Sequence, residues 1–156
     1  MHIIYCCFGG AHSSPVAAAI HLGRLPVDRR PTYRELMALD LYDKSSNEGF
    51  GCLRQLGRDD AGHAVYVLGQ GPSGQAVQRA VLSGLGLAEA SERVEIRFVD
   101  TLSCVNWWMR IGGFLSRGLG LVRVGRPIVV YGTRQAFRQL VALVESVRRD
   151  TAPRMG

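Results

Sequence analysis

The stretch CCFGGAHSSPVAAAIHLG, residues 6–23, decides the fold because it contains a strand end, a glycine turn and a helix start. The run from His2 to Phe8 is almost continuously apolar, as expected of a strand buried in a parallel sheet. Ser14 is the predicted N-cap of the helix, Pro15 its first residue and Gly23 its end. This order predicts an α/β unit.

Further elements follow along the chain. Thr32 and Glu35 in TYRE predict a capping box that opens a short helix through about Leu39. The segment CLRQLGRDDAGHAVYVLGQ predicts a β-hairpin with its turn at residues 59–62 and a second arm from Ala64 to Leu68. The other predicted elements are a helix from about Ser73 to Leu85, a strand from Val94 to Asp100, a helical stretch near Asn106 to Leu119 interrupted by Gly112-Gly113, a strand from Pro127 to Gly132, and a helix from the cap Thr133 to about Arg149.

Strands that alternate with helices predict an α/β three-layer sandwich with a mostly parallel sheet and one hairpin-paired strand. A chain of 156 residues fits one domain, which we place at residues 1–150. We expect residues 151–156 to form a frayed tail.

Charge and composition limit the classes of partner. The net charge is +6, and arginine supplies nearly all the basic residues because Lys44 is the one lysine. Arginine binds planar or tetrahedral oxyanions through a fixed fork of donors, although a skewed codon composition would give the same count. Basic residues are not interleaved with aromatics in a block, so nucleic-acid binding is not expected. No stretch is long enough for a membrane span.

The cysteines indicate a reduced protein. None of Cys6, Cys7, Cys52 and Cys104 forms a C-x-x-C pair. The chain starts with MHIIYCCFGG, which has no basic leader before its short apolar run. We therefore expect a cytoplasmic protein.

The turn after the first strand is a candidate anion site. The N-terminus of a helix exposes unpaired N–H groups and a partial positive charge, which favour an oxyanion. Glycines let a phosphate approach the backbone, and hydroxyl and imidazole groups add donors. The candidate anion-binding residues are Gly9, Gly10, Ala11, His12, Ser13 and Ser14. The alternative is a purely structural tight turn.

Cys7 is the candidate nucleophile. A thiol at the carboxyl end of the strand would lie in the positive field of the helix, where a thiolate is stabilised. His12 or Asp100 would then handle protons. The alternatives are that Cys7 is a small apolar residue of a buried strand and that His12 is a surface histidine.

The segment from Cys7 to Ala19, CFGGAHSSPVAAA, resembles the opening loop of low-molecular-weight protein tyrosine phosphatases and the related arsenate reductases. Their pattern is C-x-G-N-x-x-R-S-P followed by an alanine-rich helix. The resemblance implies that the cysteine attacks phosphorus, that loop amides hold the phosphoryl oxygens and that Ser14 supports the thiolate. Ser13 stands where the family has its arginine, and the family's aspartate-proline acid loop has no match. Asp100 in VDTLSCVN resembles the family's later strand-D-x-x-N segment.

A second resemblance covers most of the chain. IIYCCFGGAHSSPVAAAIHLGRLP and DTLSCVNWWMRIGGFLSRGLGLVRVGRPIVVYGT are similar to a family of short proteins from endospore-forming bacteria, a domain of unknown function. This resemblance implies a role in spore formation and no particular activity. It leaves open a non-catalytic module that binds a ligand or a protein partner.

A second glycine loop follows the hairpin. Gly69-x-Gly71-x-x-Gly74, with Ser73, lies between a predicted strand and a predicted helix, the context of a nucleotide-binding fingerprint. Pro72 removes one amide that could face a pyrophosphate, so a simple glycine turn is the alternative. Both glycine loops would line one crevice at the carboxyl edge of the sheet, with Gly132-Thr133 as a third wall.

Other chemistry has weaker signals. Lys44 lacks the glycines of a Walker-type loop, the histidines and cysteines lack metal-ligand spacing, and no metal or cofactor is expected. The Trp107-Trp108 helix is a core helix, a membrane-surface helix, or a contact for a protein partner or a homodimer.

Overall fold

The computed structural model describes residues 1–44, 50–87 and 95–152. Its centre is a four-stranded sheet in the order β2-β3-β1-β4. The strands are β1 (His2–Cys7), β2 (Leu53–Arg58), β3 (Ala64–Gly69) and β4 (Ile96–Asp100). Strand β1 pairs in parallel with β3 and β4, and β2 pairs antiparallel with β3. The predicted mostly parallel sheet with one hairpin-paired strand is confirmed.

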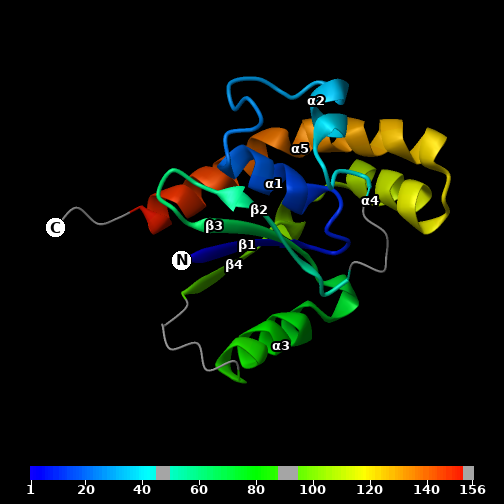
Figure 1. The fold of residues 1–156 in the computed structure, drawn as a ribbon. Helices are drawn as coiled ribbons and strands as arrows, with labels where there is room; N and C mark the ends of the chain where they lie inside the picture. The colour runs from blue at the N-terminus through cyan, green and yellow to red at the C-terminus, as the bar shows by residue number, and fades with distance from the viewer. Residues whose placement is uncertain (45–49, 88–94, 153–156) are drawn as a thin grey trace.

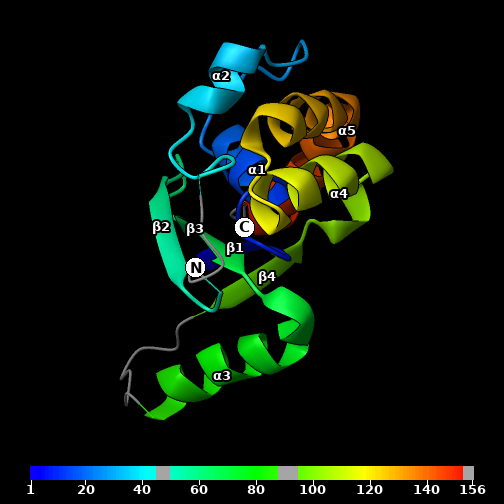
Figure 2. The same cartoon turned by 90° about the vertical axis from the view of Figure 1, so that its right-hand side faces the viewer.

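Helices cover both faces of the sheet (Figures 1 and 2). Helix α3 (Gly74–Leu87) lies on one face. Helix α1 (Ser13–His21) and the long α5 (Val122–Thr151) lie on the other, together with α2 (Tyr33–Ala38) and α4 (Trp107–Gly113). Helices on both faces of a sheet make the predicted three-layer α/β arrangement.

The apolar run of β1 serves two cores because successive side chains of a strand point to opposite faces. Ile3 and Tyr5 belong to the large core with α1 and α5. Ile4 and Cys6 belong to a smaller cluster that includes Val77 of α3. A strand covered on both sides has no polar face, which explains its almost continuous hydrophobicity.

Two local predictions are confirmed in detail. Thr32 and Glu35 form the capping box of α2, with the Glu35 carboxylate accepting from Thr32 N–H at 2.7 Å. Strands β2 and β3 form the hairpin, and its turn is closed by Gly62 N–H donating to the Asp59 carbonyl. Both patterns depend on residues close in sequence, so they need no tertiary context.

The N-terminal boundary of α1 differs from the prediction. His12, not Ser14, is the N-cap, and Ser14 is the second residue of the helix. Pro15 is therefore the third helical residue, where the missing N–H is still one that a helix leaves unpaired. The Ser14 hydroxyl is thereby available for the contact with Cys7 described below.

The predicted strand from Pro127 to Gly132 is wrong, and so is the predicted cap at Thr133. Both segments lie inside α5, which contains Pro127. The residues on the α4 side of this helix are small: a Cβ at Gly132 would lie 2.6 Å from Met109 N. Close packing of two helices, a tertiary effect, overrides the strand preference of IVV.

The remaining elements match the predictions more closely. A short 3₁₀ turn η2 (Gly71–Ser73) precedes α3, and another, η3 (Leu102–Cys104), follows β4. Helix α4 continues into a π-helical segment η4 (Phe114–Gly118) after its two glycines. The predicted frayed tail starts too early, because Thr151 is buried and ends α5. Residues 153–156 of that tail, and Val94 of the predicted strand, lie outside the described residues.

Candidate functional site

Cys7 ends β1, and its thiol lies beside the first turn of α1. Cys7 Sγ is 2.9 Å from Ser14 Oγ and accepts a hydrogen bond of 3.1 Å from Gly10 N–H. A thiolate carries no hydrogen, so in that form the sulfur would accept from both groups. The Cys7 residue is 4% exposed, so its largely enclosed sulfur has one backbone N–H donor and one hydroxyl partner.

The neighbouring Cys6 has the opposite environment. Its side chain faces the α3 side of the sheet, in a cluster with Ile4 and Leu68. Burial, followed by the effect of the nearby Asp100 carboxylate, raises the pKa of the Cys6 thiol to about 12. The two adjacent cysteines therefore differ strongly in the surroundings of their sulfurs.

Asp100 is not brought to Cys7. It is the neighbour of Cys6 in the parallel register, so the two side chains share one face of the sheet and Cys7 lies on the other. The Asp100 carboxylate is exposed and accepts the Leu102 N–H at 2.8 Å. The structure thus separates two of the candidate catalytic residues.

Glycines set the shape of the loop between β1 and α1. Gly10 has φ +64°, and a Cβ there would lie 3.0 Å from Gly69 N. A Cβ at Gly69 would in turn lie 2.9 Å from the Gly9 carbonyl carbon. The end of β3 and this loop therefore meet backbone to backbone, which only residues without a side chain allow.

The second glycine loop supports the first. Gln70 N–H donates to the Cys7 carbonyl at 3.0 Å, and Gly71 N–H donates to the Phe8 carbonyl at 2.9 Å. Ser73 and Gly74 lead into α3 on the far face of the sheet. Gly69 and Gly71 thus contact the Cys7 loop directly, and the expected third wall at Gly132-Thr133 is the interior of α5.

Ser13 is tied to the end of β4. The hydroxyl of Thr101 donates to the Cys6 carbonyl at 2.8 Å and is 2.8 Å from Ser13 Oγ. Since the single hydrogen of Thr101 is used on the carbonyl, Ser13 is the donor in their contact. The Ser13 hydroxyl is therefore committed to this internal contact.

His12 makes its contact with a loop residue that is far away in sequence. Its Nε2 lies 3.3 Å from Asp43 Oδ1 and is the donor, because an ionised carboxylate only accepts. The ring also packs edge-on against Tyr42. A Cβ at Gly113 would lie 3.1 Å from His12 Cε1, so α4 leaves room for the imidazole. His12 is held in place rather than free on the surface.

Asp43 is the centre of a charged network. Its fully enclosed carboxylate also accepts from Ser116 Oγ at 2.8 Å and from Arg126 Nε at 2.7 Å. Burial by itself would raise the pKa of Asp43, but the hydrogen bonds from His12, Arg126 and Ser116 outweigh it and lower the pKa to about 2. Asp43 is therefore ionised at neutral pH.

Several backbone N–H groups at the start of α1 and just before it lack a hydrogen-bond acceptor within the described parts of the chain. Among the described residues, no hydrogen bond has the N–H of Ala11, Ser13 or Ser14 as its donor. All three residues are buried. Buried N–H groups are nearly always paired with protein, water or a ligand. Within the described parts of the chain, these three amides are therefore donors without a protein acceptor.

A cavity of about 280 Å³ lies on another side of α1. Pro15 and Ala19 of α1, Leu39, and Leu56 of β2 are among the residues that line it. None of residues 7–14, all of which the structure describes, is part of this lining. The cavity is thus separate from the loop that carries Cys7.

Comparison with known proteins identifies the family. The sequence model of a family described as a protein of unknown function, DUF3189, matches residues 2–149. The chain belongs to the DUF3189 family. No curated protein and no solved structure matches the chain.

Sequence reasoning missed several residues of the site in this DUF3189 protein. Asp43 lies in the polar segment DLYDKSSNEGFG, for which the sequence predicted no candidate site residue, and it adopts φ +52°. Arg126 directly precedes the segment from Pro127 to Gly132 that was predicted as a strand. Their partners are 73 to 83 positions apart in sequence, so no local pattern reveals the contacts.

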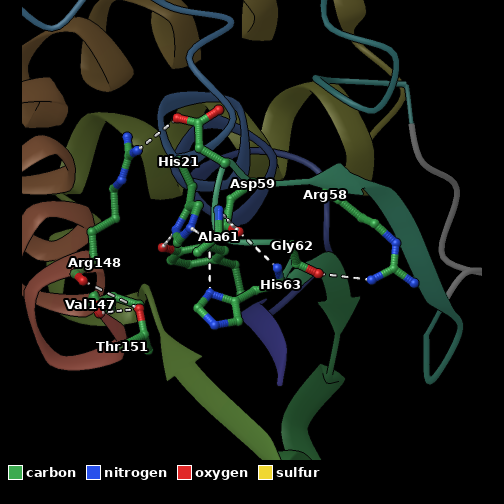
Figure 3. Close-up of polar contacts among 11 residues, drawn as sticks. His21, Arg58, Asp59, Ala61, Gly62, His63, Val147, Arg148 and Thr151 are labelled. Carbon is green, nitrogen blue, oxygen red and sulfur yellow. Dashed lines mark hydrogen bonds and ion pairs between the residues drawn. The ribbon is translucent and has the colours of Figure 1, made fainter. Parts of the chain in front are cut away.

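A second polar cluster joins α1 to the hairpin turn, as Figure 3 shows. Asp59 Oδ2 lies 3.0 Å from His21 Nε2 and 3.0 Å from His63 Nδ1, so both imidazoles donate to it. His21 Nδ1, which then has no hydrogen, accepts from the Tyr5 hydroxyl at 2.8 Å. The four side chains form one continuous chain of hydrogen bonds.

Charges in this second cluster are set by burial and pairing. Burial lowers the pKa of His21, and the hydrogen bond to Asp59 opposes the shift only in part. Burial would raise the pKa of Asp59, but hydrogen bonds from His21 and His63 outweigh it and lower the pKa to about 2. Both nitrogens of His21 and both oxygens of Asp59 have partners, which indicates a structural link between α1 and the hairpin.

Proposed function

We propose that this protein binds a phosphate-like oxyanion at residues 9–14 and uses Cys7 as a nucleophile. The observation that carries the proposal is the pair of groups around the Cys7 sulfur, Gly10 N–H at 3.1 Å and Ser14 Oγ at 2.9 Å. Such donors stabilise a thiolate, which is the reactive form of cysteine. The buried amides of Ala11, Ser13 and Ser14 supply the oxyanion site.

The reaction class that fits best is phosphoryl transfer. Cys7 Sγ would attack phosphorus, forming an S–P bond while the bond to the leaving oxygen breaks. His12, whose ring is oriented by Asp43, is the candidate to give a proton to that oxygen. A water molecule would then cleave the S–P bond, releasing phosphate and the thiolate. Thiol transfer from a small disulfide is the alternative reaction at the same sulfur.

The resemblance to low-molecular-weight tyrosine phosphatases supports the role of Ser14, which contacts Cys7 as that family's serine is expected to. Ser13 stands where that family has its arginine, and the Ser13 hydroxyl is hydrogen-bonded to Thr101. Oxyanion binding here would therefore rely on backbone amides and His12, which predicts weaker binding than in an arginine-containing loop.

Two other functions follow from the sequence and are kept as alternatives. One is a non-catalytic module of spore formation in the cytoplasm that binds a protein partner through Trp107 and Trp108, which are exposed. The other is nucleotide binding at Gly69-x-Gly71-x-x-Gly74. The latter is disfavoured because the amides of Gln70 and Gly71 already donate to the carbonyls of Cys7 and Phe8.

The test is the rate at which iodoacetamide labels each cysteine at neutral pH, read by fragment mass spectrometry. We expect Cys7 to react faster than the exposed Cys52, and Cys6 to react only after unfolding. Phosphate or vanadate should slow labelling of Cys7 and leave that of Cys52 unchanged. Ser14→Ala should slow labelling of Cys7 about tenfold, because a hydrogen bond to a charged group contributes about 1.5 kcal/mol.

The matched control is Ser103→Ala. Ser103 Oγ also contacts a cysteine, Cys104, but at 3.9 Å and away from the loop. This variant should leave the rate at Cys7 unchanged. The nucleophile would be ruled out if folded Cys7 reacted no faster than Cys6, and the oxyanion site if neither phosphate nor vanadate slowed labelling.

A further inference from the structure

The hairpin formed by α4, η4 and the first half of α5 carries an exposed apolar surface. Seven large side chains on it are about half exposed or more, with Trp107 at 70% and Phe114 at 62%. They define what we term the hairpin face: Trp107, Trp108, Phe114, Leu119, Leu121, Val124 and Tyr131. An exposed apolar group of this size marks a docking surface for a protein or a membrane.

The hairpin is rigid because its two helices meet at glycines. A Cβ at Gly112 would lie 2.3 Å from Val129 N, and a Cβ at Gly125 would lie 2.3 Å from Ser116 N. Trp108 and Tyr131 join the helices on the outside, with ring centroids 5.7 Å apart. The turn of the hairpin lies at the end of the molecule away from the C-terminus (Figure 1). Its apolar side chains are therefore presented by a fixed support.

The charge of this region is of one sign. Residues 101–144 contain six arginines and no aspartate or glutamate. Arg117 donates a hydrogen bond to the Asp43 carbonyl, and Arg126 donates one to the Asp43 carboxylate. The other four, Arg110, Arg123, Arg134 and Arg138, are exposed. The occupant of the hairpin face must therefore offer negative charge together with an apolar interior.

A second copy of this chain does not meet that requirement. A two-fold interface would place the same surface on both sides, so arginines would face arginines. An anionic bilayer does meet it, because its headgroups attract arginine and its acyl region accepts tryptophan and leucine. Leu119 and Leu121 flank Gly120 in the turn, the place from which side chains reach furthest from the body of a hairpin.

We infer that the hairpin face docks on the surface of an anionic membrane. Leu119, Leu121 and the tryptophans enter the interface between headgroups and acyl chains, and the exposed arginines bind the lipid phosphates. Within the described parts of the chain, no helix has both the length and the apolar character needed to cross a bilayer. The contact is therefore one of a peripheral protein lying on the surface.

The chain provides its own probe for this contact. Trp107 and Trp108 are its two tryptophans, so intrinsic fluorescence reports on the hairpin face. We expect vesicles of phosphatidylcholine mixed with phosphatidylglycerol to shift the emission to shorter wavelength and to sediment the protein. High salt should weaken the binding, and pure phosphatidylcholine should give none.

The decisive variant is Leu119→Glu combined with Leu121→Glu, which should weaken binding to the mixed vesicles at least tenfold. Its matched control is Leu82→Glu. Leu82 is 49% exposed on α3, on the opposite side of the sheet, so this change adds a carboxylate away from the hairpin face, one against the two of the tested variant. The control should bind as the wild type does, and circular dichroism should verify that both variants are folded.

Three results would overturn the inference. The first is no spectral shift and no sedimentation with mixed vesicles. The second is equal weakening by the Leu119/Leu121 and Leu82 variants. The third is a spectral shift that needs no vesicles: one that appears without lipid as the protein dimerises, or one that appears with polyglutamate but not with vesicles. Either form of this result would identify a protein partner. None of these results bears on the labelling of Cys7, which is measured without lipid.

Discussion

At the scale of residues, Asp43 holds the site together. It joins the loop before α1 to the α4–α5 hairpin through His12, Ser116 and Arg126. Its own backbone N–H donates to the Ala11 carbonyl, which fixes the loop that follows Cys7. One buried carboxylate thus orders a histidine, a hydroxyl and an arginine around the candidate oxyanion site.

Asp43→Asn should lower the free energy of unfolding by about 1.5–3 kcal/mol at pH 7, because it removes the charge that accepts the hydrogen bond of the partly exposed Arg126. Asparagine tolerates the left-handed backbone at this position, so the loss reports charge rather than strain. Urea unfolding of the two proteins measures the difference. A loss below about 0.5 kcal/mol, the range of ordinary surface changes, would contradict the proposed role.

The effect of Asp43 also has a defined pH dependence. The folded-state pKa is about 2, below the ordinary 3.8, so the stabilisation is complete above 3.8. It is lost as the pH falls through the folded-state value. The gap in stability between the wild type and Asp43→Asn should therefore stay constant from pH 7 to about pH 5 and shrink only in strong acid.

At the scale of elements, the close contact of α4 and α5 depends on glycine. Gly112→Ala should destabilise the protein by about 1–3 kcal/mol, because the new methyl group would overlap the backbone at Val129. Gly84→Ala in the exposed part of α3 is the matched control, since nothing lies within 4 Å of its Cβ position. It should stabilise by about 0.5–1 kcal/mol, the helix preference of alanine over glycine.

Thermal unfolding of both variants checks this pair of predictions. Equal effects of the two changes would mean that the glycines of the α4–α5 hairpin serve no packing role.

The contact between α4 and α5 also explains why the sequence prediction failed at residues 127–132. The IVV run favours a strand locally, but Gly125 and Gly132 allow α5 to pack closely on α4, and that packing stabilises a helix through Pro127.

At the scale of the whole molecule, a cluster of four side chains connects the β2–β3 hairpin to helix α1 (Figure 3). The cluster consists of Tyr5, His21, Asp59 and His63. Burial lowers the pKa of His21 below its ordinary 6.5, so the unfolded chain binds a proton more readily. The free energy of unfolding should therefore fall as the pH falls below about 6.5.

His21→Gln tests this dependence, because it removes the titrating ring. Chemical unfolding between pH 5 and 7.5 should give a shallower slope of stability against pH than in the wild type. His2 also has a lowered pKa and contributes in the same direction, so His2→Gln is the comparison that separates the two. An unchanged slope in His21→Gln would show that His21 is not the responsible group.

The sequence by itself determined the features that depend on neighbours: the buried strand before Cys7, the helix after it, the capping box of α2 and the β2–β3 hairpin. The contact between Ser14 and Cys7 was implied only by the resemblance to the phosphatase loop, because the residues themselves predicted Ser14 as the helix N-cap. Only the tertiary structure decided that residues 127–132 are helical, that Asp100 faces away from Cys7 and that Asp43 orients His12. These outcomes depend on contacts between distant segments, whose free energy exceeds local preference and leaves no periodic trace in the sequence.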